Sequence, residues 1–376
     1  MEFTVNTKPL KSAMAMLLVS GNVTNANPRS SIVELTASKD TLKLNTQSTG
    51  IKSEVRLIGN GTDDSTEKFI ANIGLFKSLI NSLNATQTTL CFEENCLQIK
   101  SGKTTLSVKK DDNISGMSLM TPTIPDIDAI EAADAVDVAD WKFVKEHQAY
   151  ALSRITKPSA VYTYFFFTED GEVIAGDYVH SLFSKSECGQ LDKNCLVSPF
   201  IINLMATMPA EAKFVCKDDN YVVVVKNDSF DYYAQVEVVA DAETIEAYPH
   251  EAILSLLGDT ETKGINFEIE ELKAVLNQAS LLSSTLEPEI SIDLSKNVIH
   301  IKDTNVESSI IGEGEVSDPC TLAFDLVVLK SIVDKCSDNK ITIFPSISDD
   351  EVSGIVIVGE SAVTVLGCKA DDVDVS

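Results

Sequence analysis

The side chains that most often carry out catalysis are few in this chain, and their spacing predicts no active site. The four histidines, His147, His180, His250 and His300, have no acidic or nucleophilic partner at a recognised catalytic spacing. No nucleophile elbow, phosphate-binding loop or zinc-protease motif occurs. Asp218-Asp219-Asn220 separates two apolar runs, which is typical of a turn rather than of a cation site. We therefore expect no catalytic residue and no cofactor.

The cysteines also lack the spacing of a metal site. They are Cys91, Cys96, Cys188, Cys195, Cys216, Cys320, Cys336 and Cys368, and no two of them form a Cys-x-x-Cys pair. The N-terminus does not read as a secretory signal, and no run of 18 apolar residues occurs. We expect a soluble cytoplasmic protein with reduced thiols, no bound metal and no membrane partner.

Charge is the property in which this sequence is unusual. Its 57 acidic and 30 basic side chains give a formal net charge of -27, while its apolar content of 44% is that of a globular protein. The six segments that we predict as helices hold ten basic and seven acidic residues, so the negative surplus lies outside them. The helix propensity of lysine and the turn preference of aspartate explain part of this asymmetry. Alternatively, the helices share a surface that faces a polyanion, and the acidic exterior faces solvent.

The periodicity of apolar residues predicts helices and strands in a regular order. The helices are expected at residues 7–19, 72–84, 139–157, 198–208, 268–284 and 325–337, with Thr7, Asn72 and Ser198 as N-caps. Strands are expected at 31–37, 41–46, 52–58, 88–92, 97–100, 104–108, 161–168, 172–175, 181–187, 212–217, 221–226, 230–238, 289–293, 298–303, 308–314, 340–344, 354–358 and 362–367.

The same order occurs three times along the chain. Leu75–Ile80 aligns with Phe200–Met205 at an offset of 125 residues and with Val328–Val333 at an offset of 253. We therefore predict an α+β fold built from three tandem copies of a unit in which two helices pack on antiparallel sheets. The predicted domains are residues 1–125, 126–247 and 248–376, the last with an acidic C-terminal tail. Residues 111–138 and 240–264 are rich in Asp, Glu, Pro and Thr and are predicted to be linkers.

Three local stretches resemble a known family. They are Met1–Val5 with the helix and Val19-Ser20-Gly21 after it, Leu97–Val108, and Tyr248-Pro249. Their order and the chain length resemble those of bacterial DNA sliding clamps, the β-subunit processivity factors of DNA polymerase. The chain has Gly176–Leu182 where the family has Thr-x-Gly-His-Arg-Leu, and Leu366–Lys369 with an acidic tail where the family ends in Met-Pro-Met-Arg-Leu. These departures favour a remote, phage-encoded member that acts in a bacterial or phage-infected cell.

The resemblance implies a head-to-tail homodimeric ring around double-stranded DNA. Twelve packed helices enclose an opening of roughly 21–28 Å, which admits a duplex, whereas the six helices of one chain leave almost no opening. Lysine side chains that reach phosphates through water would hold DNA without reading its sequence. The residues expected to face DNA are Lys8, Lys11, Arg29, Lys77, Lys142, Lys145, Arg154, Lys157, Lys273, Lys330 and Lys335.

The resemblance also implies protein partners. Short peptide motifs of a DNA polymerase and of the clamp loader would bind in an apolar groove between the second and third copies. The groove maps to Tyr162, Gly176, Asp177, Leu182, Pro249, Leu254, Val365, Leu366 and Cys368. The subunit interface maps to Leu83, Leu106 and Val108 of one chain and to Leu281 and Leu282 of the other.

Two other functions remain open from the sequence. One is a monomeric processivity factor that grips DNA on a basic face without closing around it. The other is an acidic DNA mimic that inhibits nucleic-acid-binding proteins through its net charge, and the basic helices disfavour it. The mass in solution distinguishes a monomer from a ring.

Overall fold

The computed structural model describes residues 1–21, 28–48, 50–124, 135–151, 160–177, 181–187, 191, 193–217, 220–257, 263–282, 289–303, 306–316, 318, 320–336, 338–348, 351–359 and 362–368. The chain divides into two compact units. The first unit comprises residues 1–141 and 203–238, and the second comprises 142–202 and 239–376. Among the described residues, no helix is long and apolar enough to cross a membrane.

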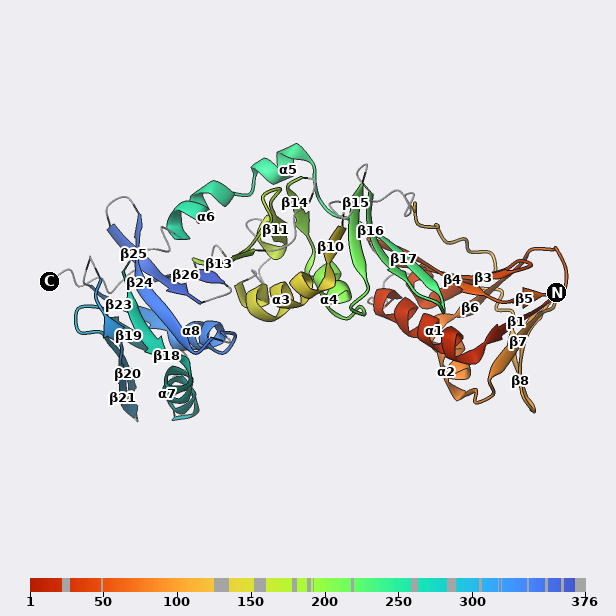
Figure 1. Ribbon diagram of the computed structural model, residues 1–376, viewed down its shortest axis with the longest axis horizontal. Coiled ribbons are helices and arrows are strands. Elements are labelled where there is room, and N and C mark those ends of the chain that lie inside the picture. The colour runs from red at the N-terminus through yellow and green to blue at the C-terminus, as the bar shows by residue number, and fades with distance from the viewer. Residues whose placement is uncertain are drawn as a thin grey trace. The chain divides into compact units, whose positions relative to one another are not determined.

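Eight α-helices occur in the described residues (Figure 1). They are α1 (Thr7–Gly21), α2 (Ile73–Ser82), α3 (Val138–Gln148), α4 (Pro199–Ala206), α5 (Ala242–Glu246), α6 (His250–Leu257), α7 (Ile269–Leu282) and α8 (Leu326–Val333). Short 3-10 helices are η1 (Pro28–Ser31), η4 (Ala149–Ala151) and η5 (Ala160–Thr163). The predicted caps at Asn72 and Ser198 are confirmed, because Asn72 Oδ1 accepts from Leu75 N and Ser198 Oγ accepts from Ile201 N. The predicted cap at Thr7 is wrong, since Thr7 is itself the first residue of α1, and its hydroxyl pairs with that of Thr88 at 2.8 Å.

Two antiparallel sheets form the first unit. The smaller has the order β5-β1-β7-β8-β9, and the larger has the order β10-β15-β16-β17-β4-β3-β2-β6. The strands of the smaller sheet are β1 (Glu2–Asn6), β5 (Asn60–Gly61), β7 (Gln87–Phe92), β8 (Cys96–Ser101) and β9 (Thr104–Lys109). Those of the larger are β2 (Ile32–Ala37), β3 (Thr41–Ser48), β4 (Ile51–Ile58), β6 (Glu67–Asn72), β10 (Ala135–Asp137), β15 (Lys213–Lys217), β16 (Asn220–Lys226) and β17 (Asp231–Val236).

The second unit also has two antiparallel sheets, with the orders β14-β11-β12-β13-β26-β25-β24-β18-β22 and β21-β20-β19-β23. The strands of the larger sheet are β11 (Phe165–Phe167), β12 (Glu172–Asp177), β13 (Leu182–Glu187), β14 (Cys195–Val197), β18 (Ile265–Glu268), β22 (Glu313–Gly314), β24 (Lys340–Ser348), β25 (Glu351–Val358) and β26 (Val363–Gly367). Those of the smaller are β19 (Glu289–Asp293), β20 (Val298–Asp303), β21 (Val306–Ile311) and β23 (Thr321–Asp325).

One pattern of strands and helices is repeated three times in these sheets. A strand pairs with the first strand of a later meander and runs directly into a helix: β1 into α1, β10 into α3 and β18 into α7. A second strand pairs with the first strand of an earlier meander and leads into the second helix: β6 into α2, β14 into α4 and β23 into α8. The α+β class and the antiparallel sheets are therefore confirmed.

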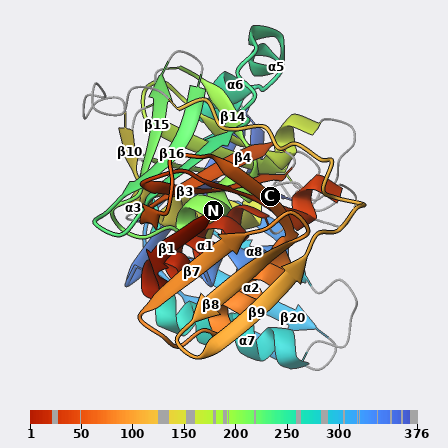
Figure 2. The same cartoon turned by 90° about the vertical axis from the view of Figure 1, so that its right-hand side faces the viewer.

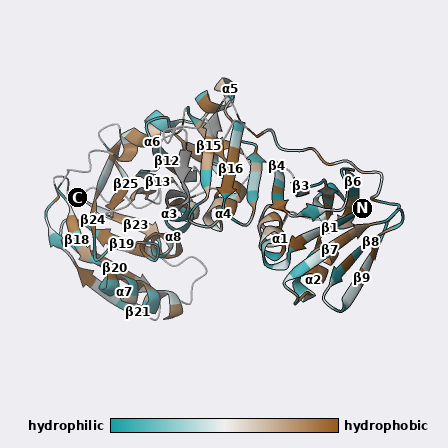
Figure 3. Cartoon of the chain, turned by 45° about the vertical axis from the view of Figure 1, so that its right-hand side comes forward, coloured by the Kyte–Doolittle hydropathy of each residue, from teal (hydrophilic) through white to brown (hydrophobic). Residues whose placement is uncertain are grey.

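The helices bury their apolar stripes against these sheets. In α1, Leu10, Met14 and Leu17 are fully buried, and the helix packs on β3 and β4. The valine run in β16 is buried on both faces of its sheet and makes this a hydrophobic strand (Figure 3). These contacts make α1 and its sheet one core.

The predicted linkers are wrong in part. Residues 240–264 contain α5 and α6, because Asp241 accepts a hydrogen bond from Thr244 N at the start of α5 and because Ile253 and Leu257 are buried on α6. The acidic composition of this segment obscured its helical pattern. Residues 111–138 include β10, which pairs with β15.

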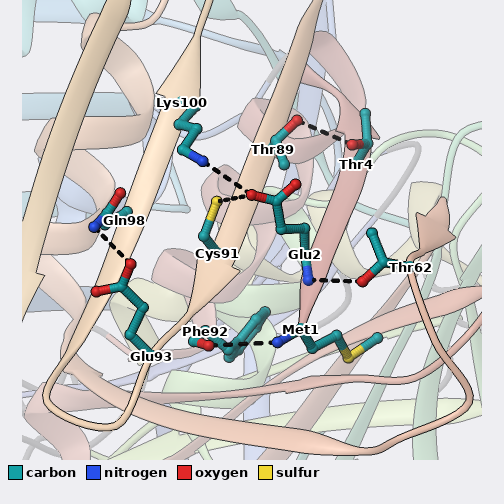
Figure 4. Close-up of polar contacts among 10 residues, drawn as sticks. All are labelled: Met1, Glu2, Thr4, Thr62, Thr89, Cys91, Phe92, Glu93, Gln98 and Lys100. Carbon is teal, nitrogen blue, oxygen red and sulfur yellow. Dashed lines mark hydrogen bonds and ion pairs between the residues drawn. The ribbon is translucent and has the colours of Figure 1, made fainter.

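The outer face of the smaller sheet in the first unit carries a polar row (Figure 4). Glu2 Oε1 on β1 accepts from Lys100 Nζ at 2.9 Å and from the Cys91 thiol at 3.2 Å. The hydrogen bond from Lys100 holds the pKa of the Glu2 carboxyl below its usual value, while burial raises the pKa of the Cys91 thiol. These hydrogen bonds join β1 to β7 and β8, so we assign the row a role in stabilising the sheet.

Candidate nucleic-acid and peptide interfaces

In the first unit, the predicted DNA-facing lysines lie on the neighbouring helices α1 and α2 (Figure 1). Lys8 is exposed and Lys77 is half-buried. Lys11 Nζ donates to Asn81 O at 3.0 Å, which commits it to holding α1 against α2. Arg29 is exposed in η1. Lys8 and Lys77 are therefore the lysines of this helix pair that have no hydrogen bond or ion pair with the described residues.

In the second unit, the predicted lysines gather around the end of α8. The Cys336 carbonyl accepts from Lys273 Nζ of α7 at 2.9 Å, and His147 Nδ1 of α3 lies 2.6 Å from the Lys335 carbonyl. Lys330 of α8 forms an ion pair with Asp334, the residue that follows the end of the helix. Lys273 and Lys330 are thus engaged within the chain.

The remaining basic residues have different environments. Lys142 and the side chain of Lys335 are exposed, and Lys145 is half-buried on α3. Arg154 and Lys157 lie outside the described residues. Of the lysines predicted to face DNA, Lys8, Lys77, Lys142, Lys145 and Lys335 are therefore the ones whose side chains have no hydrogen bond or ion pair among the described residues.

All the predicted groove residues belong to the second unit, and three share one apolar cluster. Tyr162 of η5 and Val365 of β26 are buried in it, and Leu254 of α6 packs against it half-buried. Leu182 and Leu366 are paired residues where β13 meets β26, and both are nearly fully buried. The structure therefore brings α6, β13 and β26 together.

The other groove residues border the same strands. Gly176 of β12 is needed for close packing, because a Cβ there would lie 2.6 Å from the Phe183 ring. Asp177 is buried, Pro249 is exposed before α6, and Cys368 is half-buried after β26. Burial raises the pKa of the Cys368 thiol, which keeps it protonated and unreactive at neutral pH.

Three aromatic rings of this cluster contact one another, and the His250 ring stacks on one of them. The Phe166 ring lies 4.7 Å from Tyr248 and 5.1 Å from His250, and Tyr162 lies 5.6 Å from Tyr248. The Tyr248 hydroxyl is buried and has no hydrogen-bond partner among the described residues. Burial, and secondarily the charge of Tyr162, raise the pKa of Tyr248 above its ordinary value. A buried phenol without a partner destabilises the fold.

Replacing Tyr248 with phenylalanine is therefore expected to raise the free energy of unfolding by up to about 1 kcal/mol in urea titrations. Tyr150→Phe is the matched control, because the Tyr150 hydroxyl is hydrogen-bonded to Thr364 Oγ1 at 2.7 Å. The Tyr150→Phe substitution should lower the free energy of unfolding by about 1 kcal/mol. A larger loss in the free energy of unfolding for Tyr248→Phe than for Tyr150→Phe would show that the Tyr248 hydroxyl has a hydrogen-bond partner.

The predicted interface residues lie near two strands that end their sheets. Leu106 and Val108 are on β9, the outermost strand of its sheet (Figure 2), where Leu106 is half-buried and Val108 is buried. Leu83 is buried within its own chain at the end of α2. Leu281 on α7 is 84% exposed, and the side chain of Leu282 lies outside the described residues.

Sequence reasoning missed one exposed apolar side chain in the same region. Ile311 on β21 is 75% exposed, and α7 packs directly on β21. The alternation of apolar and polar residues predicted a strand at β21, but it could not reveal which face of that strand the rest of the chain leaves exposed. A long exposed apolar side chain on an outermost strand is the signal of an interface.

The histidines and cysteines form no catalytic or metal-binding arrangement among the described residues. No group of three or more His, Cys, Asp or Glu side chains there could hold a metal ion. His147 and His250 stack on Phe143 and Phe166, and His300 is exposed on β20. The cysteines that the structure describes in full are free thiols. His180, Asp218 and Asp219 lie outside the described residues.

Neither protein-family models nor the sequences of curated proteins give a match to this chain. Solved structures do. The β chain of DNA polymerase III from Streptococcus pneumoniae superposes with a TM-score of 0.74 at 15% identity, over 98% of this chain and 99% of that one. The β subunit from Pseudomonas aeruginosa gives 0.74 at 13% identity, over 98% and 100%. The DNA polymerase sliding clamp from Bacillus subtilis gives 0.73 at 14% identity, over 99% and 100%. The chain therefore has the fold of bacterial DNA polymerase III β-subunit sliding clamps.

Proposed function

We propose that this chain is a sliding clamp, two copies of which close head to tail around duplex DNA and tether a DNA polymerase. The proposal rests on one observation about the sheets. Four meanders of the chain are joined in two pairs through their third strands, while the third strands of the other two meanders have no such partner among the described residues. The third strand of one meander pairs with the third strand of another at β4·β17, with Ile51 opposite Val236, and again at β13·β26, with Leu182 opposite Leu366.

The same positions in the first and third copies are β9 and β21. Each is the outermost strand of its sheet, and neither pairs with another strand on its outer side among the described residues. An antiparallel pairing of β9 with β21 of a second copy would repeat the two internal junctions. Because each chain offers one strand of each kind, two copies form two such junctions and close the assembly.

The apolar side chains at these strands support the same pairing. Leu281 on α7 and Ile311 on β21, two elements that pack together, are exposed, and Leu106 lies half-buried on β9. A homodimer interface is most apolar at its centre, where such side chains are excluded from water. Contact between β9 and β21 would cover them and would remove two unpaired strand edges.

DNA would be held by the lysines of the helix pairs. Lys8 and Lys77 in the first unit, and Lys142, Lys145 and Lys335 in the second, have side chains available for phosphates. Contacts to phosphate are independent of sequence and allow sliding. We propose a structural role without a catalytic step, in the cytoplasm of a bacterial or phage-infected cell, for three clamp domains at residues 1–125, 126–247 and 248–376.

The polymerase and the clamp loader would bind through short peptides at the cluster formed by α6, β13 and β26. Leu254 and Leu256 make a matched pair, because both lie half-buried on α6 against this cluster. We expect Leu254→Ala to weaken binding of a synthetic peptide ending in Leu-Phe by about tenfold, as loss of an interface anchor does. Leu256→Ala should leave the affinity unchanged in fluorescence anisotropy. Equal affinity of both variants for the peptide would place its anchor elsewhere.

Sedimentation equilibrium of the purified chain tests the proposal against a monomeric processivity factor and an acidic DNA mimic. A mass of twice 40.7 kDa is expected for a closed ring. A species of 40.7 kDa at all concentrations that still binds DNA would favour the monomeric factor.

A further inference from the structure

A pocket of 320 Å³ lies in the first unit beside β6, the outermost strand of the larger sheet. Lys68 and Phe69 of β6 form one wall, and Glu93 and Glu94 of the β7–β8 turn form another. This volume is near the lower end of ligand pockets, about 300 Å³, and suits one long side chain. None of the residues that line the pocket is assigned above to DNA, peptide or subunit binding.

Glu34 of β2 lines this pocket with a carboxylate that is poorly paired. The residue is only 5% exposed, and its one polar contact among the described residues is Lys68 Nζ, 3.4 Å from Oε1. The Lys68 side chain is itself 63% exposed. Charge-assisted hydrogen bonds to buried carboxylates are about 2.7–2.9 Å long, so this contact compensates little of the cost of burying the charge.

The same sheet shows how a buried glutamate is satisfied. Glu34 of β2 faces Asn45 of β3, which faces Glu54 of β4. Glu54 is 3% exposed and accepts a 2.5 Å hydrogen bond from Arg56 Nε. Between the two glutamates, Asn45 Oδ1 is buried and has no hydrogen-bond partner in the part of the chain that the structure describes. Glu54 is therefore paired with a guanidinium, whereas the described residues supply no guanidinium to Glu34.

The rest of the pocket favours an arginine as that donor. Glu93 and Glu94 add negative charge at the exposed rim. With Glu34 they make three carboxylates against the two ammonium groups of Lys68 and Lys110, so the lining has a net negative charge. Phe69 and Met117 offer apolar surface to an aliphatic stem. A guanidinium has five donors and bonds a carboxylate in a bidentate manner. A metal ion is disfavoured, because the described acidic, histidine and cysteine side chains form no group of three that could hold one.

The outer edge of β6 can take the backbone of the same ligand. Its inner edge pairs with β2 from Glu67 to Asn72, and no described strand pairs with its outer edge. An extended segment can add to such an edge through main-chain hydrogen bonds while one side chain enters a neighbouring pocket. We propose that a partner protein docks here as an added strand and inserts an arginine against Glu34.

The test uses the full chain and three synthetic pentapeptides, Val-Thr-X-Val-Thr, in which X is arginine, lysine or citrulline. We expect the arginine peptide to bind, to shift the amide resonances of β6 in NMR, and to bind at least about tenfold more tightly than the citrulline peptide. The lysine peptide should fall between them, because its ammonium cannot bond both carboxylate oxygens.

Glu34→Gln keeps the shape of the side chain and should lower the affinity for the arginine peptide at least about tenfold. Glu54→Gln is the matched control and should leave the peptide affinity unchanged, because Glu54 already has Arg56. Equal binding of the arginine and citrulline peptides to the unmodified chain would overturn the proposal, and that comparison does not depend on any variant folding. Shifts confined to other strands, or self-association of the chain through β6, would also overturn it.

Discussion

Replacing both Leu281 and Ile311 with aspartate is expected to convert the dimer into monomers. The two side chains are 84% and 75% exposed in the single chain, so the substitutions leave its core intact. In the proposed pairing of β9 with β21 they become buried, and a carboxylate without a partner there costs several kcal/mol per copy. Since about 1.4 kcal/mol is a factor of ten, the dissociation constant should rise by more than about a thousandfold. Sedimentation equilibrium measures the fall in mass from twice 40.7 kDa to 40.7 kDa.

The matched control places the same two charges on exposed apolar residues that the proposal leaves in solvent. Ile58 is 83% exposed at the end of β4, and Ile347 is 46% exposed on β24. The Ile58→Asp, Ile347→Asp variant should remain a dimer. A dimer that survives the Leu281 and Ile311 substitutions, or that is lost equally in the control, would contradict an interface at β21.

Neutralising four lysines of the helix pairs is expected to abolish most of the affinity for duplex DNA without changing the mass of the dimer. The variant replaces Lys8, Lys77, Lys142 and Lys335 with alanine. Each lysine that contacts a phosphate contributes roughly 0.9 to the slope of the logarithm of the binding constant against that of salt concentration. The two subunits together lose eight lysines, so the slope should fall by up to about 7.2, and the affinity for a short duplex at low salt by well over tenfold.

The control for this experiment removes the same charge from the sheets and turns. It replaces Lys39, Lys213, Lys226 and Lys263, all exposed, with alanine. Net charge alone would weaken DNA binding equally in both variants, because both lower the total positive charge by the same amount. Equal salt slopes in fluorescence anisotropy would therefore contradict a DNA-facing role for the helix pairs.

Local sequence signals predicted six of the eight helices in the described residues, α5 and α6 being the two that were missed. Asn72 and Asp325 each precede an apolar run with helical spacing, and both side chains accept hydrogen bonds from the first turn of the helix that follows. The meanders were also predictable, because tight turns such as Ser101-Gly102, with Gly102 at a positive φ of 59°, join strands of alternating pattern.

The strands that precede the helices were missed for a physical reason. β1, β6, β10, β14, β18 and β23 are short, and each runs directly into a helix. The partners of such strands can be distant in sequence, as in the pairing of Glu2 on β1 with Cys91 on β7. A segment of three to six residues has no local pattern that reveals a partner so far along the chain.

The sequence predicted which residues could form the candidate site, but not which of their side chains are available to bind a ligand. Lys11 and Lys273 read as free cations in the sequence, yet they donate to the Asn81 and Cys336 carbonyls. Those bonds join segments 70 and 63 residues apart, so no local pattern signals them. Burial at Leu83 and exposure at Ile311 likewise depend on tertiary packing.

Topological retention on DNA tests the central claim most directly. The protein is incubated with nicked circular DNA, its two subunits are cross-linked chemically, and the complex is isolated in high salt, where contacts to phosphate are screened. A head-to-tail ring predicts that the cross-linked dimer stays with the circle and is released when one cut makes the DNA linear. Release of the cross-linked dimer from circular DNA as readily as from linear DNA would contradict encirclement.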